Sequence, residues 1–509
     1  MSRMTTIRRY GKNTRKQRAE ELFAQLPGTP VKAKMESPPK TALTLRPDVD
    51  VIEEDYVSEI SKQLEAIRLD KMAPVEETNT EVWIPNRSVS SDRLAEAMRN
   101  NVSRQRSEDV DQRSLRDEDE GSCDDDILSW DDVCPVGDTI EKIAEASYAE
   151  VYRLTNEHGT SIVKVVRLES PIKPQTKAQE RSGLVDEEPH SEEDMRGELS
   201  ISEWLADIPG FVVYKERYVV KGKAPKALLE THQAFHRRMK RKDPDRLQFY
   251  PSPSRYLDET RFLVVELGDA GTALEDFELT SISQVWDVFF HTALALARAE
   301  DLIEFEHRDL HEGNLCIRQV RPPTIKPSPS SPIQFGFSGL DITILDYGLS
   351  RATDPDAPRE ESEPPEVVAY DLEKDLTLFQ STHAPQCRVY RLMRSFLVHE
   401  DRVDLPPKHH VTPYPVSKAT GEPISWMGYY PYTNVLWLAY LYGYLVSHFK
   451  GDKKELARFK KETAELWLHL DPGAPRDVLS FPSAGDVVRF AVEAGWVGEG
   501  QLVDVLGGG

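Results

Sequence analysis

The sequence predicts an α+β fold in which a small, strand-rich part precedes a larger helical part. Before residue 270 the apolar residues occur in short runs typical of strands, at 140–152, 161–166 and 261–268. After that point the apolar spacing becomes helical, at 285–303, 435–441 and from residue 453 onward. We therefore expect a two-lobed molecule with a β-rich N-terminal lobe and a large helical C-terminal lobe.

The domain organisation follows from the uneven composition. A length of 509 residues allows about three average domains, but 35 prolines and 30% charged residues favour one large domain with disordered stretches. Residues 1–128 lack sustained apolar periodicity, so we expect a largely disordered arm with a basic cluster and an acidic run. The N-terminal lobe would then cover 129–270 with a flexible insertion at 170–193, and the C-terminal lobe 271–509 with an insertion at 321–338.

Charge and cysteine content narrow the class of protein. The chain has 64 Lys and Arg against 87 Asp and Glu, a formal charge of −23, so we expect it to attract basic partners, with no direct nucleic-acid binding by the folded domain. Its four cysteines show no zinc-binding spacing, which suits a reducing compartment. The apolar stretch 428–449 contains Pro431, Asn434 and several tyrosines, which favours a buried helix over a membrane span.

The most informative motif is His-Arg-Asp-Leu-His-Glu-Gly-Asn at 307–314, followed by Ile-Leu-Asp-Tyr-Gly at 344–348. Phosphoryl transfer needs a carboxylate that orients the attacking hydroxyl and oxygen ligands for magnesium beside the phosphates. Asp309 fits the first role, and Asn314 and Asp346 fit the second. The sequence therefore predicts a site for ATP and Mg²⁺.

Chance alone could place an Asp and an Asn in any polar loop, so the neighbouring elements matter. A buried-face helix at 285–303 leads into this loop, and short apolar runs at 315–317 and 342–345 suit a hairpin. Such a hairpin would return Asp346 to Asp309 despite their separation in sequence. A purely structural cluster would not explain a second Asp directly after a buried strand.

The residues upstream predict the rest of the nucleotide site. Lys164 lies in an apolar strand of the kind that grips the α- and β-phosphates. The segment 140–152 occupies the place of a phosphate-covering hairpin, and its usual glycines are replaced by three alanines that lose access to positive φ. We expect the nucleotide to contact the following residues of this hairpin: Ile143, Ala144, Ala146, Ala149 and Val151.

Two further contacts are expected around Lys164. Glu198 lies on an amphipathic helical pattern and is the predicted ion-pair partner of Lys164, with Glu203 as the competing choice and a solvated helix face as the alternative for both. The strand 261–268 ends in a glycine-containing connector, so Glu266 and Gly268 are the predicted adenine-binding positions.

With these parts in order, the chain resembles the haspin family of atypical eukaryotic protein kinases, and in particular its fungal members. The resemblance rests on three segments, at 305–314, 341–351 and 430–438, the last of which reads Tyr-Pro-Tyr-Thr-Asn-Val-Leu-Trp-Leu. It implies a protein-kinase-like fold without an Ala-Pro-Glu motif. It also implies Lys164 and Glu198 as an ion pair, Asp309 as catalytic base, and Asn314 and Asp346 as metal ligands.

The chain departs from the family pattern at several positions. Haspins commonly have Asp-Tyr-Thr at the metal motif, where this chain has Gly348, and the three alanines put nucleotide affinity in question. His311 stands where most serine/threonine kinases have Lys, so we count it among the catalytic residues and expect a pH-sensitive contribution.

The resemblance also implies a substrate, because haspin kinases phosphorylate a threonine near the start of the histone three N-terminal tail, a basic segment. Asp371, Glu373 and Asp375 resemble the acidic family segment that contacts it. A helix cap with solvated charges is the equally weighted alternative. A role in mitotic chromatin, and a location in the nucleus and on chromosomes with the cytoplasm as alternative, are expected on the same ground.

Two other functions stay open. Choline and aminoglycoside phosphotransferases also place a His two residues after the catalytic Asp, although Arg308 and the 434–438 segment favour a protein kinase. A pseudokinase scaffold is the non-enzymatic alternative. It would use the arm, where Arg9-Tyr10-Gly11-Lys12 resembles a short docking peptide of cohesin-regulating proteins.

Overall fold

The computed structural model describes residues 127–501, apart from positions 136, 147, 158, 182–183, 185, 245–247, 327, 329–330, 356–364, 414–415, 419–420 and 499–500. All of the described residues belong to one compact unit. Most of the predicted arm, including the basic cluster, the acidic run and the Arg9–Lys12 peptide, lies outside them. Residues 127 and 128, which we assigned to the arm, instead form a short strand, β1 (Ile127–Leu128), paired with β5.

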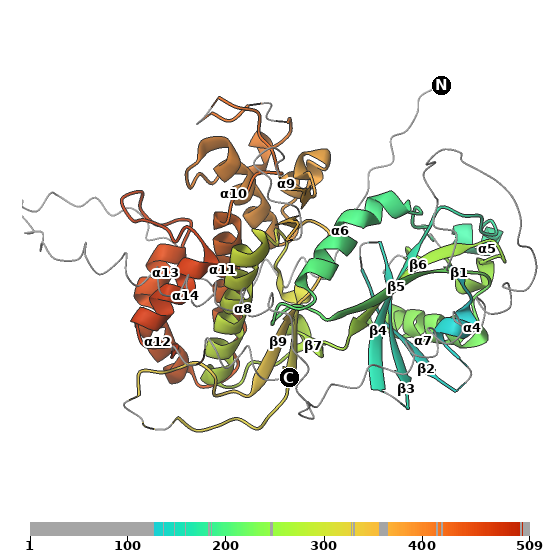
Figure 1. The fold of residues 1–509 in the computed structure, drawn as a ribbon, viewed down its shortest axis with the longest axis horizontal. Helices are drawn as coiled ribbons and strands as arrows, with labels where there is room; N and C mark the ends of the chain where they lie inside the picture. Colours follow the sequence, from blue (N-terminus) through green and yellow to red (C-terminus); the bar gives the residue numbers. More distant parts are fainter. Residues whose placement is uncertain are drawn as a thin grey trace, which may run out of the picture. The chain divides into compact units, whose positions relative to one another are not determined.

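The N-terminal lobe is built on a six-stranded sheet (Figure 1). In spatial order it contains β1, β5 (Tyr214–Lys221), β6 (Arg261–Gly268), β4 (Gly159–Arg167), β3 (Glu150–Asn156) and β2 (Thr139–Glu145). Only the β1–β5 pair is parallel. The predicted strands at 140–152, 161–166 and 261–268 are all present.

Alternating side chains give this sheet two apolar faces. On β4, Val163 and Val165 lie in a cluster that includes Leu228 of α7 (Lys226–Lys242), together with residues of the short helix α4 (Trp130–Val133). Val166 lies in another cluster, with Met195 and Leu199 of α6 (Glu192–Leu205). Because successive strand side chains point to opposite faces, Lys164 shares the α6 face with Val166. The helix α6 begins at a Ser191–Asp194 capping box.

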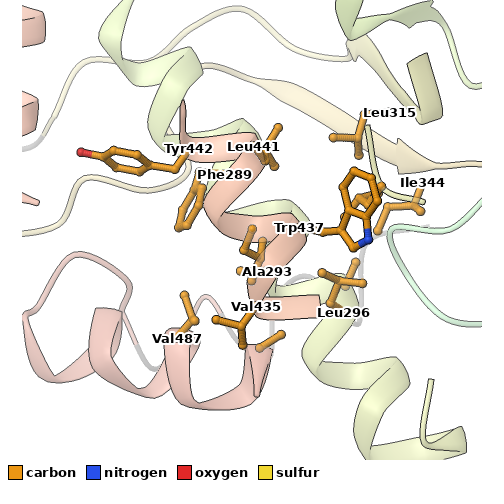
Figure 2. Packing of buried hydrophobic residues seen from close by; sticks show 14 of the residues in the cluster. Phe289, Ala293, Leu296, Leu315, Ile344, Val435, Trp437, Leu441, Tyr442 and Val487 are labelled. Carbon is orange, nitrogen blue, oxygen red and sulfur yellow. The ribbon is translucent and has the colours of Figure 1, made fainter. Parts of the chain in front are cut away.

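The C-terminal lobe packs helices around α8 (Ile282–Ile303) and α11 (Tyr432–His448). Figure 2 shows Phe289, Ala293 and Leu296 of α8 beside Val435, Trp437 and Leu441 of α11, with Val487 of α14 (Ala484–Glu493) close by. The other helices here are α9 (Thr377–Gln380), α10 (Gln386–His399), α12 (Lys453–Glu462) and α13 (Ala464–Leu470). The described helices include none that is long and apolar enough to cross a membrane.

Two small sheets complete this lobe. The first contains β7 (Thr272–Ala273), β8 (Leu315–Gln319) and β9 (Leu340–Ile344), and the second pairs β10 (Arg351–Thr353) with β11 (Val367–Ala369). The predicted insertion 321–338 joins β8 to β9, and its end is held by Asp287 of α8. The carboxylate of Asp287 accepts hydrogen bonds from the amides of Gly336 and Ser338 at 2.6 and 2.7 Å.

The insertion at 170–193 is less loose than predicted in the part that the structure describes. It contains a short helix, α5 (Lys177–Arg181), and its last two residues begin α6. The amides of Lys173 and Glu187 donate to the carbonyls of Arg255 and Phe249, and Arg255 pairs with Asp186 at 2.5 Å. These bonds tie the segment to the loop that precedes β6.

Candidate active site

The loop from α8 to β8 carries the His-Arg-Asp motif and is held by a buried ion pair. Arg308 is completely buried and adopts φ = 63°. Its Nε and Nη2 atoms each donate to Glu306 at 3.1 Å, and its guanidinium lies 5.2 Å from the Trp426 ring centroid. The Glu306 carboxylate also accepts from the Tyr430 amide at 2.7 Å and the Thr433 hydroxyl at 2.8 Å. The 430–438 segment is therefore what anchors this loop.

His307 and Asn434 connect the same loop to α11 and to β9. The amide of His307 donates to Oδ1 of Asn434 at 3.0 Å, while Nδ2 of Asn434 donates to the Phe305 carbonyl at 2.9 Å. The His307 ring accepts from the Asp309 amide at Nδ1 and donates to the Leu345 carbonyl from Nε2 at 3.0 Å. Burial lowers the pKa of His307 to about 4, so this ring is neutral and structural.

Asp309, Asn314 and Asp346 come together as predicted. Nδ2 of Asn314 donates to the Asp309 carbonyl at 2.8 Å, and the Asn314 carbonyl accepts from the Leu345 amide at 2.9 Å. Asp346 follows directly and adopts φ = 64°, a left-handed conformation uncommon outside glycine. Because β8 pairs with β9 at Leu315 and Ile344, residues separated by the whole insertion meet at one end of the hairpin.

The two carboxylates of this group have different protonation behaviour. Burial raises the pKa of Asp309 to about 6, although His311 and the Tyr390 hydroxyl act in the opposite direction. Burial would also raise the pKa of Asp346, but the Lys164 ammonium and the Gly348 amide outweigh it and hold the pKa below its usual value. A carboxyl group poised near neutrality suits proton acceptance, and one kept ionised suits cation binding.

Asn314 and Asp346 have the chemistry of magnesium ligands. Since the Asn314 amide nitrogen is engaged with Asp309, its side-chain oxygen remains to contact a cation. An ionised carboxylate and an amide oxygen are the ligand types that Mg²⁺ prefers, usually with phosphate oxygens completing the shell. Among the described residues no group of three or more His, Cys, Asp or Glu could hold a metal without such help.

Lys164 forms the predicted ion pair with Glu198. Nζ of Lys164 lies 2.5 Å from Oε1 of Glu198. The competing candidate, Glu203, instead faces Arg217 at 3.5 Å in an exposed pair. Burial lowers the pKa of Lys164, and the charge of Asp346 opposes this shift. Lys164, Glu198 and Asp346 thus act on one another electrostatically.

The phosphate-covering loop between β2 and β3 tolerates its alanines without strain. None of Ala144, Ala146 and Ala149 is among the described non-glycine residues with positive φ. The Ala146 amide donates to the Ala149 carbonyl at 2.8 Å, and Ala149 is fully buried with the α6 cluster. The three alanines therefore fit the loop without needing a left-handed backbone conformation.

The remaining predicted nucleotide contacts lie on strands around Lys164. Val151 is directly opposite Lys164 in the β3–β4 ladder, and Ile143 is the residue skipped by a bulge in β2. The Glu266 carboxylate accepts from Ser161 at 2.6 Å and Lys215 at 3.3 Å, and the Gly268 amide donates to the Val213 carbonyl. The carboxylate of Glu266 is thus already hydrogen-bonded to residues of the sheet.

His311 and the predicted substrate acids have local partners. Nδ1 of His311 accepts from the Gly313 amide at 3.0 Å, and Nε2 lies 3.9 Å from Asp309 Oδ1. Glu373 binds the buried Arg394 through both oxygens, at 2.7 and 2.8 Å. Asp371 caps the turn that holds Glu373 but stays exposed, and Asp375 caps Thr377. The capping alternative thus describes Asp371 and Asp375, whereas Glu373 is the partner of a buried arginine.

Two tyrosines at the site were missed by sequence reasoning. The Tyr390 hydroxyl, from α10, donates to Oδ1 of Asp309. The Tyr148 hydroxyl, from the phosphate-covering loop, donates to Oε2 of Glu198. Tyr148 could have been noticed, since it lies between two of the alanines, whereas no pattern links Tyr390 to a residue 81 positions away.

Comparison with known proteins decides the family. A family model described as a haspin like kinase domain matches residues 90–486, which is more than half of the chain. The chain belongs to the haspin kinase family. The resemblance stated from the motifs, and the α+β kinase-like fold that it implied, are confirmed.

Several haspins are similar to this chain over part of its length. The serine/threonine-protein kinase haspin homolog hrk1 of Schizosaccharomyces pombe is 30% identical over 346 residues, which cover 64% of this chain and 58% of that protein. The Drosophila melanogaster haspin homolog is 27% identical over 317 residues, covering 59% of this chain and 47% of that protein. Mus musculus haspin is 26% identical over 353 residues, which cover 68% of this chain and 40% of that protein. The chain therefore matches between about two fifths and three fifths of the length of these haspins.

Proposed function

We propose that this chain is a serine/threonine protein kinase that transfers the γ-phosphate of ATP to a threonine near the start of the histone three N-terminal tail. The observation that carries the proposal is the meeting of Asp309, Asn314 and Asp346 at one end of the β8–β9 hairpin, beside Lys164. Several relatives carry the name serine/threonine-protein kinase haspin.

In this proposal each residue has one task. Asp309 accepts or orients the proton of the substrate hydroxyl, and Tyr390 holds its carboxylate in place. Lys164, oriented by Glu198, binds the α- and β-phosphates. Asn314 and Asp346 would hold magnesium, which supplies charge neutralisation at the β- and γ-phosphates. His311, close to Asp309, adds a positive charge when protonated.

The basic tail is supported as substrate by charge. The chain has a formal charge of −23, and Asp371 leaves an exposed carboxylate on the segment after the metal motif. Opposite charges favour encounter and alignment of a basic peptide. Glu373 is better suited to holding this segment in shape, because Arg394 engages both of its oxygens.

The test is a phosphorylation assay with purified full-length chain, Mg-ATP and a peptide of the histone three tail start. We expect phosphate on threonine, and its loss in Asp309→Asn by a factor on the order of 10² to 10⁴. A peptide with the threonine replaced by valine is the matched substrate control. Absence of labelling by the wild-type chain, where a control kinase labels its own substrate, would refute the proposal.

Two alternatives give different results in the same experiments. A pseudokinase scaffold would show no thermal stabilisation by ATP with magnesium, and the joint presence of Lys164, Asp309, Asn314 and Asp346 argues against it. A small-molecule phosphotransferase would consume ATP with choline or an aminoglycoside and ignore the basic peptide. The anchoring of the catalytic loop by Glu306 and Asn434, both tied to the 430–438 segment, favours the protein kinase.

The wider setting is proposed on the same family ground. We place the kinase in the nucleus and on chromosomes during mitosis, with chromatin as its partner. The Arg9–Lys12 peptide would add docking to a cohesin regulator. Imaging of the tagged chain in dividing cells, compared with a variant in which these four residues are alanine, tests both points: chromosomal signal is expected from the intact chain and reduced signal from the variant.

A further inference from the structure

A tyrosine of the phosphate-covering loop lies directly on the predicted ion pair. The Tyr148 hydroxyl donates to Oε2 of Glu198 and accepts from Nζ of Lys164 at 3.3 Å. The Lys164 ammonium also lies 4.6 Å from the Tyr148 ring centroid. The centroids of the Tyr148 and His190 rings are 5.4 Å apart in an edge-to-face arrangement. One side chain thus contacts both members of the pair that should serve the nucleotide.

The loop that carries Tyr148 is fixed at both ends by a buried network. Nζ of Lys142 binds Glu145 at 2.9 Å and also binds Glu150, so one buried ammonium joins the residues that flank the loop. The Tyr250 hydroxyl donates to the Ala146 carbonyl at 2.7 Å. The described residues on either side of Tyr148 are thus held by hydrogen bonds and ion pairs.

The metal motif leaves room for this arrangement. A Cβ atom on Gly348 would lie 2.9 Å from the Tyr148 hydroxyl, closer than a carbon and an oxygen pack. The backbone of Gly348 lies outside the left-handed region, so a side chain here would have to displace the tyrosine hydroxyl but would not strain the backbone. Tyr148 and Gly348 are therefore a complementary pair across the site.

We propose that Tyr148 sets the affinity of this site for nucleotide by occupying, through its hydroxyl, one of the three Lys164 N–H donors that phosphate oxygens would otherwise share. The inference rests on the proposed kinase function. A hydroxyl is a neutral acceptor and a phosphate oxygen a charged one, so nucleotide can displace it, at the cost of the hydrogen bonds to Lys164 and Glu198. Tyr148 acts through these two residues and is a positioning residue.

Three variants of the full-length chain separate this idea from a purely structural role. Tyr148→Phe removes the hydroxyl and keeps the ring that packs on Lys164 and His190. Gly348→Ala pushes the hydroxyl away, while its Cβ would meet Asp346 and Glu198 only at ordinary contact distances of 3.4 and 3.7 Å. Tyr442→Phe is the matched control, because it removes a tyrosine hydroxyl of α11 that shares a hydrogen bond with Thr463 in the C-terminal lobe. Calorimetry would measure the Kd of magnesium with a non-hydrolysable ATP analogue.

We expect Tyr148→Phe to bind the analogue about three- to tenfold more tightly, the factor that corresponds to the net contribution of the hydroxyl's hydrogen bond with Lys164. KM for ATP should fall by a similar factor with kcat changed less, and Tyr442→Phe should match the wild type in both. Gly348→Ala should also tighten binding, but should add almost nothing in the Tyr148→Phe background, because the hydroxyl it displaces is already gone.

Unchanged or weaker binding by Tyr148→Phe would overturn the inference, as would equal effects of Gly348→Ala in both backgrounds. A chain whose wild-type form binds no analogue at all would instead refute the proposed function. The two failures are therefore distinguishable in one titration series.

Discussion

The hydroxyl of Tyr390 donates a hydrogen bond to the Asp309 carboxylate and so joins α10 to the centre of the site. This bond favours the ionised form of Asp309, against the effect of burial, which raises the pKa of this group to about 6. The contact therefore affects both the orientation of the Asp309 carboxylate and its protonation.

Removal of that hydroxyl should shift the pH dependence of catalysis. The proposed base works when ionised, so kcat/KM of the wild type should rise with pH through about 6 and then level off. In Tyr390→Phe the ionised form loses a hydrogen bond, so the midpoint should move to higher pH. Rate profiles from pH 5 to 9 measure this shift, and Asp309→Asn should show no such limb. Superimposable wild-type and Tyr390→Phe profiles would contradict the assignment.

Glu300 should make the stability of the fold depend on pH. Burial raises its pKa to about 7, although its oxygens accept from Asn434 at 2.9 Å and from the first amides of α14. The folded chain then binds more protons than the unfolded chain between about 4.5 and 7, so this residue lowers the free energy of unfolding as pH rises through that window. The cost at higher pH is roughly 3 kcal/mol.

Denaturant unfolding of Glu300→Gln at pH 5 and pH 7.5 tests this account. The amide oxygen of Gln can still accept hydrogen bonds, and the variant cannot ionise. Its loss of stability between the two pH values should therefore be smaller than that of the wild type. An equal loss in both proteins would mean that Glu300 is not the group responsible.

Arg308 should make activity independent of phosphorylation in the activation segment. In many kinases a phosphate on that segment orders it through arginine contacts. Here the guanidinium is already neutralised by Glu306 and stacked near Trp426, completely out of solvent. Phosphatase-treated enzyme should keep its kcat on the histone peptide. A large loss, reversed by rephosphorylation, would show that another site receives a phosphate.

Removal of charge should affect substrate binding at Asp371 and the stability of the fold at Glu373. Asp371→Asn should raise KM for the basic peptide several-fold with little change in stability, because this carboxylate is exposed. Glu373→Gln should instead destabilise the fold, by about 3 kcal/mol or more, because the buried Arg394 would lose its carboxylate counter-charge. Peptide kinetics and thermal unfolding of the two variants provide each other's control.

Much of the fold could be predicted because its elements show their periodicity locally. The helix predicted at 285–303 is present as Ile282–Ile303, extended by the Ser281 cap, and the predicted strands occur at their expected places. The exact start of the folded domain could not be predicted. The two residues of β1 are too few to produce a pattern, and their partner, β5, lies about ninety positions away.

The site likewise contains residues that the sequence could predict and contacts that it could not. Lys164, Asp309, Asn314 and Asp346 each lie beside a recognisable strand or loop, so their order along the chain indicated their meeting. The contacts that depend on distant packing gave no such signal. The pairing of Glu373 with Arg394, the bond from Tyr390 to Asp309 and the choice of Glu198 over Glu203 all depend on how helices are placed, which local sequence does not express.

The insertion between β8 and β9 is a suitable place to insert a reporter domain. Its ends leave and return on neighbouring strands, with Asp287 holding Gly336 and Ser338 and with Thr324 bonded to Phe337 at 2.9 Å. Ile325, just beyond this closure, is 94% exposed. A fluorescent protein spliced in after Ile325 would thus leave both strand ends joined as they are, giving a reporter fusion that keeps the chain's own termini untouched.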